Sequence, residues 1–149
     1  MDKKNKVTDI SELGEFGLID RLTSSFSVTN KDLIKGIGDD AAVFDSGDKC
    51  FLVTTDLLVE GIHFNLIYTP LKHLGYKSVV VNLSDLYAMN SLPRYITVSL
   101  AISKKFSVEA LEQLYDGIKL ACDRFDVELI GGDTTSFLSG LFINITAIG

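Results

Sequence analysis

The stretch Arg94-Tyr95-Ile96-Thr97-Val98-Ser99-Leu100-Ala101-Ile102-Ser103 alternates strictly between branched apolar residues and their tyrosine, threonine, serine and alanine neighbours. Successive side chains of a β-strand point to opposite faces, so this pattern predicts a strand that is buried on one face only. The segment Leu141–Ile148 follows the same rule and predicts a second half-buried strand.

The sequence on either side predicts a mixed order of helices and strands. Further strands are expected at residues 41–44, 50–55 and 127–130, and a short helix at residues 15–22. The short helix is expected to turn Phe16, Ile19 and Leu22 inward. Ser107 can cap a longer helix, because apolar residues recur after it at three- and four-residue steps: Leu111, Leu114, Tyr115, Ile118, Cys122 and Phe125.

Residues 71–89 are ambiguous between helix and strand. Three consecutive valines at 79–81 favour a strand, but the segment is long, lacks internal proline and is bracketed by two prolines. We predict a helix. On a helix Ser78, Asn82 and Asp85 share one face, which places an amide beside a carboxylate. On a strand Asn82 and Asp85 would point to opposite faces.

Composition restricts the class of protein and its partners. The chain has 149 residues, 46% of them hydrophobic and 23% charged, which suits one globular domain. A net charge of −6 and the lack of a basic, aromatic-rich block argue against nucleic acid as a partner. No apolar run is long enough to cross a membrane, and the basic residues 1–6 lack the apolar region of a signal peptide. A cytoplasmic protein is therefore expected, with Cys50 and Cys122 as buried, reduced thiols.

Four short acidic motifs suggest a magnesium site. Carboxylates that converge without a cation repel each other by about 3 kcal/mol at 5 Å and an effective dielectric constant near 20. Magnesium bound together with a nucleotide phosphate is the usual remedy. The motifs, called the acidic stations below, are Gly36-Ile37-Gly38-Asp39-Asp40, Thr54-Thr55-Asp56, Asn82-Leu83-Ser84-Asp85 and Gly131-Gly132-Asp133-Thr134.

Each station also has a plainer interpretation. Gly38-Asp39-Asp40 alone is typical of a turn, and Thr54-Thr55-Asp56 can cap the end of a strand as well as offer hard oxygen ligands. Asp85 has apolar neighbours and would be costly to bury without a partner. Gly131-Gly132-Asp133-Thr134 follows a predicted strand, where glycine lets the backbone approach phosphate and aspartate can hold the accompanying metal.

The remaining reactive residues point to no covalent chemistry. His63 and His73 lack a metal-ligand spacing and, on the residues alone, are expected at the surface or in packing. No arrangement of Ser, His and Asp or of Cys and His indicates a covalent nucleophile. Any phosphate chemistry would therefore be direct in-line transfer, in which metals neutralise charge.

Taken together and in order, these motifs resemble the thiamine-monophosphate kinases. More loosely, they resemble the wider family of ATP-using enzymes similar to aminoimidazole-ribonucleotide synthetase. The resemblance spans nearly the whole chain. It rests on Gly14-Glu15-Phe16, residues 36–41, Thr54-Thr55-Asp56 followed by His63-Phe64, residues 81–89 and residues 129–135.

The resemblance implies that ATP phosphorylates thiamine monophosphate to thiamine diphosphate, with several Mg²⁺ ions bridging the phosphates. It implies that His63 contacts the substrate and that Gly132 and Asp133 lie beside ATP. It places six residues among the metal ligands: Asp40, Thr54, Thr55, Asp56, Asp85 and Asp133.

The resemblance also implies a domain organisation. Residues 1–149 would form a single amino-terminal domain that binds ATP and magnesium and makes a homodimer. Its fold would be α+β, with a mixed or antiparallel sheet of about four strands flanked by helices. The sheet would pair with that of a second subunit into a barrel, with ATP near that interface.

Two departures from the family pattern stand out. Family members are about twice as long, so the chain corresponds to their amino-terminal half and is expected to have little or no turnover alone. Asn90 replaces a glycine that is common in the family. Asparagine tolerates the left-handed conformation at a helix end, so the same geometry is expected.

Two other interpretations stay open on the sequence alone. One is a sibling enzyme of the selenophosphate-synthetase or carbamoyl-dehydration type, which would use another acceptor. The other is a non-catalytic dimerisation module whose aspartates merely bind cations. In an enzyme, residues 57–70 are the candidate loop for closing over substrate.

Overall fold

The computed structural model describes residues 8–149, so the basic start at residues 1–6 lies outside the described part. The chain divides into two compact units, residues 1–31 and residues 32–149. The first unit holds a short 3-10 helix, η1 (Ile10–Glu12), and α1 (Gly14–Thr23). The side-chain carboxylate of Asp9 accepts the Ser11 N–H and caps η1.

Helix α1 confirms the predicted short helix but not the orientation of its apolar residues. Phe16 is 80% exposed, Leu22 is 64% exposed and Ile19 is also exposed, so the prediction that they face inward is wrong. The described part of this unit supplies one ten-residue helix and no second layer against which an apolar stripe could pack.

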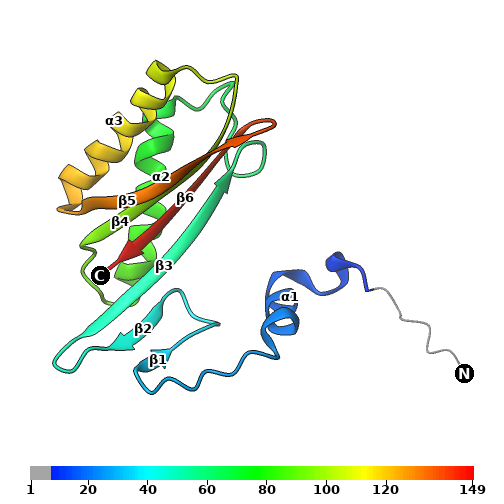
Figure 1. The fold of residues 1–149 in the computed structure, drawn as a ribbon, viewed down its shortest axis with the longest axis vertical. Coiled ribbons are helices and arrows are strands. Elements are labelled where there is room, and N and C mark those ends of the chain that lie inside the picture. Colours follow the sequence, from blue (N-terminus) through cyan, green and yellow to red (C-terminus); the bar gives the residue numbers. More distant parts are fainter. Residues whose placement is uncertain (1–7) are drawn as a thin grey trace, which may run out of the picture. The chain divides into compact units, whose positions relative to one another are not determined.

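The second unit is built on a mixed sheet of six strands, where about four were expected (Figure 1). The strand order is β1-β2-β3-β6-β4-β5, and only β4 and β5 run parallel. Strand β1 has three residues, too few to show an alternating pattern. The strands are β1 (Leu33–Lys35), β2 (Ala42–Asp45), β3 (Cys50–Val59), β4 (Tyr95–Ser103), β5 (Glu128–Phe137) and β6 (Leu141–Ile148).

Within the second unit, helices cover one face of this sheet and leave the other open. Helix α2 (Leu71–Ala88) packs on β3 and β6, and α3 (Val108–Phe125) packs on α2 (Figure 1). The alternating strands predicted for β4 and β6 are confirmed, and the two pair antiparallel within the sheet. On β6 every second residue, from Leu141 to Ala147, is buried. The covered face therefore carries the core, and the intervening residues form what we call the open face.

The ambiguous segment is a helix, as predicted, and α3 follows its predicted apolar stripe. Ser107 Oγ accepts the Ala110 N–H at 3.2 Å, which confirms the cap. Asn90 has φ of 58°, the left-handed conformation expected at this helix end.

Cys50 is exposed, contrary to prediction, because it lies at the outer end of the β2–β3 pair; Cys122 is buried. No helix among residues 8–149 is long and apolar enough to cross a membrane.

Two glycines bring α2 and α3 together. A Cβ atom on Gly117 would overlap the Lys72 carbonyl oxygen, and one on Gly75 would overlap the Leu114 carbonyl oxygen. The backbones therefore touch where the helices cross, which fixes how α3 packs on α2.

We expect Gly117→Ala to lower the free energy of unfolding by about 1–3 kcal/mol, because the added methyl group forces the two helices apart. Urea denaturation measures this change. Gly131→Ala is the matched control, because a Cβ there meets nothing within 4 Å. Equal stability of Gly117→Ala and the control would show that the crossing is not tight.

Candidate functional site

The candidate site forms where the edge of β3 becomes free. Strand β2 pairs with β3 only as far as Val53, so within the described part of the chain one edge of β3 lacks a strand partner from Thr54 onward. Strand β3 was expected to end at residue 55, but it continues to Val59 because its other edge pairs with β6 throughout. The station Thr54-Thr55-Asp56 therefore lies within a strand and not at its end.

Helix α2 lies over this free edge. It places the station that contains Asn82 and Asp85 in contact with the station Thr54-Thr55-Asp56. Asn82 Oδ1 accepts the Asp56 N–H at 3.0 Å, and the Asn82 amide in turn donates to the Ser78 carbonyl at 3.0 Å. One turn along α2, Asp85 Oδ2 accepts the Thr54 hydroxyl at 3.1 Å. The predicted shared face of Asn82 and Asp85 is confirmed, and their partners are the predicted residues of β3.

Thr55 lies on the other side of the sheet. Side chains alternate along a strand, so Thr54 and Asp56 point toward α2 while Thr55 is on the open face. Its hydroxyl donates to the Ile145 carbonyl at 3.2 Å and accepts the Asn144 amide at 2.9 Å and the Thr146 hydroxyl at 3.1 Å. The Asn144 amide also donates to the Asp56 carbonyl at 3.0 Å. The side chain of Thr55 therefore belongs to a polar row on the open face.

Asp56 is held in an environment that disfavours its charge. Burial raises the pKa of Asp56 most, the negative charge of Asp85 raises it further, and His63 has a smaller opposite effect. The two carboxylates are thus close enough to repel each other, and a cation between them would relieve that repulsion.

This donor set fits magnesium. Two carboxylates and a threonine hydroxyl are hard oxygen ligands, and Mg²⁺ commonly takes one or two carboxylates and completes its shell with water and substrate phosphates. Among residues 8–149, no three His, Cys, Asp or Glu side chains gather as a ready-made metal cage. The remaining ligands would have to come from a phosphate, from water or from another chain.

Asp40 lies in the turn before β2, as its station predicted. A hollow of about 410 Å³ at this turn is lined by residues that include Asp39, Asp40, Thr54 and Thr55. Asp39 pairs with Lys35 and accepts the Asp40 N–H at 3.0 Å. The first station is therefore brought next to the second, with Asp40 left out of the Lys35 pair.

His63 sits in a tight turn after β3. Its Nδ1 accepts the Val59 N–H at 3.0 Å, and its own N–H donates to the Val59 carbonyl at 2.9 Å. Because Nδ1 accepts, a neutral imidazole carries its proton on Nε2, which can donate to an anion. His63 is exposed and its charge acts on Asp56, so it borders the carboxylate pair.

The fourth station lies on β5, at the far edge of the sheet. It was expected to follow a strand, but it lies inside one, because β5 pairs with β4 through to Phe137. Gly132 permits this pairing, since a Cβ there would overlap the Val98 carbonyl oxygen. Among residues 8–149, no strand pairs with the outer edge of β5, so its main-chain groups on that side lack partners in a β-ladder.

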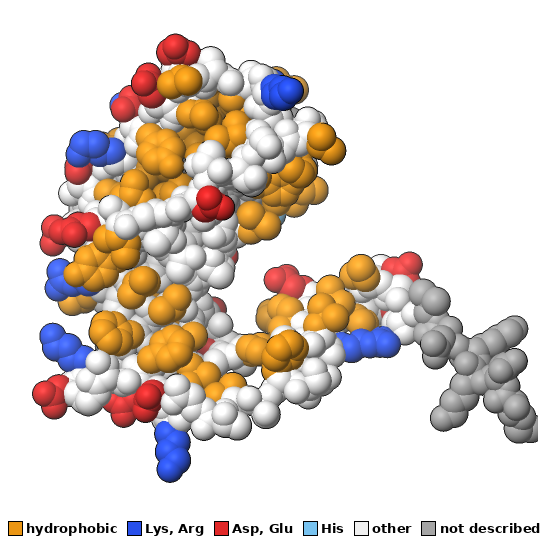
Figure 2. Space-filling view, viewed as in Figure 1, with side chains coloured by type: hydrophobic (Ala, Val, Ile, Leu, Met, Phe, Trp, Pro, Cys, Tyr) orange, Lys and Arg blue, Asp and Glu red, His pale blue; other side chains and the backbone are white. Residues whose placement is uncertain are grey.

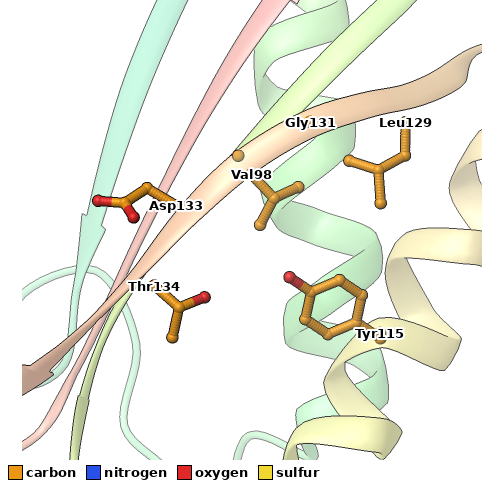
Figure 3. A pocket seen from close by; sticks show the side chains of 7 residues that line it. Val98, Tyr115, Leu129, Gly131, Asp133 and Thr134 are labelled. Atoms are coloured by element: carbon orange, nitrogen blue, oxygen red, sulfur yellow. The ribbon is translucent and has the colours of Figure 1, made fainter.

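A hollow of about 500 Å³ lies along this part of β5 (Figure 3). The Tyr115 ring on α3 and the Thr134 side chain border it, while the Asp133 carboxylate points away from it (Figure 3). Its volume is in the usual range for small-molecule sites. The hollow is lined by Val98, Tyr115, Leu129, Gly131, Gly132, Asp133 and Thr134.

The structure does not bring Asp133 to the other acidic residues within one copy of the chain. Asp133 pairs with Ser99, which places its side chain on the open face, opposite Asp56 and Asp85. Strands β5 and β3 are three positions apart, a separation of about 14 Å at about 4.8 Å per strand. Three stations therefore converge and the fourth stands apart.

The sequence analysis did not identify two residues that lie near these sites, Tyr115 and Asn144. Tyr115 was assigned only to the apolar stripe of α3, yet it is partly exposed and borders the β5 hollow. Its position at the edge of the stripe, with a polar hydroxyl, was the available signal. Asn144 gave a weaker signal, as a polar residue at an open-face position of a half-buried strand.

We expect Asp56→Asn to raise the melting temperature at pH 7 without magnesium. The folded state binds the Asp56 proton more tightly than the unfolded state, so the contribution of Asp56 to stability is present below its ordinary pKa of about 3.9 and lost as pH rises through the raised value. The difference between variant and wild type should therefore vanish in acid. Magnesium should also reduce the difference in melting temperature between Asp56→Asn and wild type, because a bound cation stabilises the wild-type carboxylate.

Differential scanning calorimetry between pH 3 and pH 8, with and without chelator, measures these differences. Asp116→Asn, an exposed change on α3, controls for the loss of one negative charge. A wild type at least as stable as Asp56→Asn at pH 7 in chelator would contradict the repulsion.

Comparison with known proteins shows which proteins this chain is similar to. The thiamine-monophosphate kinase of Bacillus subtilis is 35% identical over 138 residues, and that of Aquifex aeolicus is 39% identical over 124 residues. These matches cover 92% and 83% of this chain but only 42% and 38% of the two relatives. The chain therefore spans well under half the length of these relatives.

A solved structure described as AaThiL complexed with AMPPCP and TMP superimposes with a TM-score of 0.84 and 34% identity. The superposition covers 96% of this chain and 44% of the solved structure. The family of the AIR synthase related protein, N-terminal domain, matches residues 38–149, a range that includes β3, α2 and β5. The chain therefore belongs to the family of AIR synthase related proteins, as their N-terminal domain.

Proposed function

We propose that this chain is the ATP- and magnesium-binding part of a thiamine-monophosphate kinase. In the proposed reaction the terminal phosphoryl group of ATP passes directly to the phosphate of thiamine monophosphate, giving thiamine diphosphate and ADP. The proposal rests chiefly on the convergence of Thr54, Asp56 and Asp85 at the free edge of β3. The relatives named thiamine-monophosphate kinase support the choice of substrate.

Each part of the site has a proposed role. Asp40, Thr54, Thr55, Asp56, Asp85 and Asp133 would supply metal ligands, and a metal there would neutralise charge on the phosphates. Because the Thr55 hydroxyl is already bonded on the open face, we assign its carbonyl oxygen as the more accessible ligand. The Nε2–H of His63 would donate to the substrate phosphate. Gly132 and Asp133 would lie beside ATP, with the Tyr115 ring against the base.

We further propose that a second copy pairs on the open face, as the predicted barrel requires. Several large apolar side chains on that face are exposed, among them Phe51 at 52% and Leu57 at 50%. Phe137 and Phe142 pack edge to face there, with ring centroids 4.6 Å apart. Figure 2 shows hydrophobic side chains along this unit. Pairing would cover these side chains. If ATP contacts both copies, pairing would also explain how Asp133, which lies away from Asp56 and Asp85 in one copy, can take part in the site. A cytoplasmic location stays a prediction from composition.

We expect a non-hydrolysable ATP analogue to bind this chain only when magnesium is present, as isothermal titration calorimetry with and without chelator would show. Asp85→Asn should weaken that binding on the order of tenfold, or about 1.4 kcal/mol, because it removes one ligand charge. The fold should survive, since asparagine keeps an oxygen that accepts the Thr54 hydroxyl. Asp116→Asn is the charge-matched control. Equal affinity of Asp85→Asn and wild type, or a collapsed fold, would contradict the assigned role.

We expect the 149-residue chain alone to show little or no turnover, because it spans 42% or less of the kinases named above. The measurement is ADP release that depends on thiamine monophosphate, compared between this chain and a full-length kinase that contains it. Full-length protein should be active with this acceptor. Robust turnover by the 149 residues would overturn the expectation.

A further inference from the structure

The turn that carries His63 is closely bound to its surroundings. The Gly61 N–H donates to the Phe64 carbonyl at 2.8 Å, and Phe64 is buried in the core. Val59 is bonded to His63 in both directions, through the ring Nδ1 and the main-chain carbonyl. Residues 57–59 belong to β3, so the loop expected at 57–70 begins later and starts with this fixed turn.

One contact ties the turn to α2. The Lys77 ammonium donates to the main-chain carbonyl of His63 at 3.1 Å, across fourteen residues of sequence. A hydrogen bond from a charged donor is stronger than a neutral one, and this bond acts on the residue whose ring is proposed to meet the substrate. Neither the acidic stations nor the family resemblance pointed to Lys77.

Helix α2 thereby makes three hydrogen bonds to residues 54–63, the segment formed by β3 and the turn after it. Lys77 holds His63, Asn82 holds Asp56 and Asp85 holds Thr54. Lys77 and Asp85 are eight residues apart, which spans about 12 Å on a helix. A rigid helix therefore sets the distance from the carboxylate pair to the imidazole, provided that the Lys77 bond is present.

We propose that Lys77 is a positioning residue, whose ammonium fixes the His63 imidazole relative to Asp56 and Asp85 so that Nε2–H meets the substrate phosphate. This inference rests on the proposed function for the identity of the substrate. The geometric part does not depend on it, because the hydrogen bonds of the His63 turn can be observed directly. Without the bond, the turn loses its anchor to the helix that carries the metal ligands.

Nuclear magnetic resonance of histidine labelled with ¹⁵N tests the geometry in this chain. The chain has two histidines, so His73 serves as an internal reference. In spectra recorded at a pH where imidazole is neutral, the wild-type His63 ring should carry its proton on Nε2 and accept at Nδ1. Lys77→Met keeps the aliphatic stem and removes the donor, and it should shift the His63 ring signals toward mixed tautomers and speed exchange of the His63 amide. Lys77→Arg should restore the wild-type pattern.

Lys72→Met is the matched control, because it removes an exposed lysine from the same helix. It should leave His63 unchanged. In a full-length kinase that contains this chain, Lys77→Met should raise the KM for thiamine monophosphate on the order of tenfold, with the KM for ATP and kcat changed by less than about twofold.

Two results would overturn the proposal: His63 signals in Lys77→Met that match those of wild type, or altered signals with an unchanged KM for thiamine monophosphate. A different result would refute the proposed function instead. That result is a full-length wild type with the expected His63 signals but no turnover of thiamine monophosphate.

Discussion

The register of α2 on the edge of β3 is the constraint on which the candidate site depends. Asn82 and Asp85 reach the strand because β2 stops at Val53 and leaves the edge free for a helix side chain. The contacts of α2 with β3 and β6 hold it in that register, and the close crossing at Gly75 and Gly117 packs α3 on its outer side. A shift of one residue along α2 rotates each side chain by about 100°, so the amide and carboxylate would lose their partners together.

The sheet separates the polar residues into two groups. The covered face has Thr54 and Asp56 beside α2, and the open face has the row made by Thr55, Asn144 and Thr146. Burial and the charge of Asp85 raise the pKa of Asp56, whereas Thr55, Asn144 and Thr146 hydrogen-bond to one another on the open face. The first group therefore has the charge and oxygen ligands that the proposed Mg²⁺ would need, and the second joins β3 to β6 through side-chain hydrogen bonds.

Prediction from the sequence succeeded where one short-range rule sufficed. The alternation in β4 and β6, the stripe in α3 and the shared face of Asn82 and Asp85 follow from the period of a strand or helix. It failed at the ends of β3 and β5, because pairing with β6 and β4 carries β3 through Asp56 and β5 through Gly131-Gly132-Asp133, residue types that disfavour strands. The apolar stripe of α1 was misjudged for a related reason, since burial needs a partner surface that periodicity cannot supply.

The sequence by itself determined the mixed order of helices and strands, the segments that carry the acidic stations and the left-handed conformation at Asn90, because these depend on periodicity and local backbone preference. Only the tertiary structure decided which stations meet. It joined those of β3 and α2, placed Thr55 on the opposite face from Thr54, and left Asp133 three strands away. The physical reason is that strand order and helix register come from long-range packing, which no local pattern encodes.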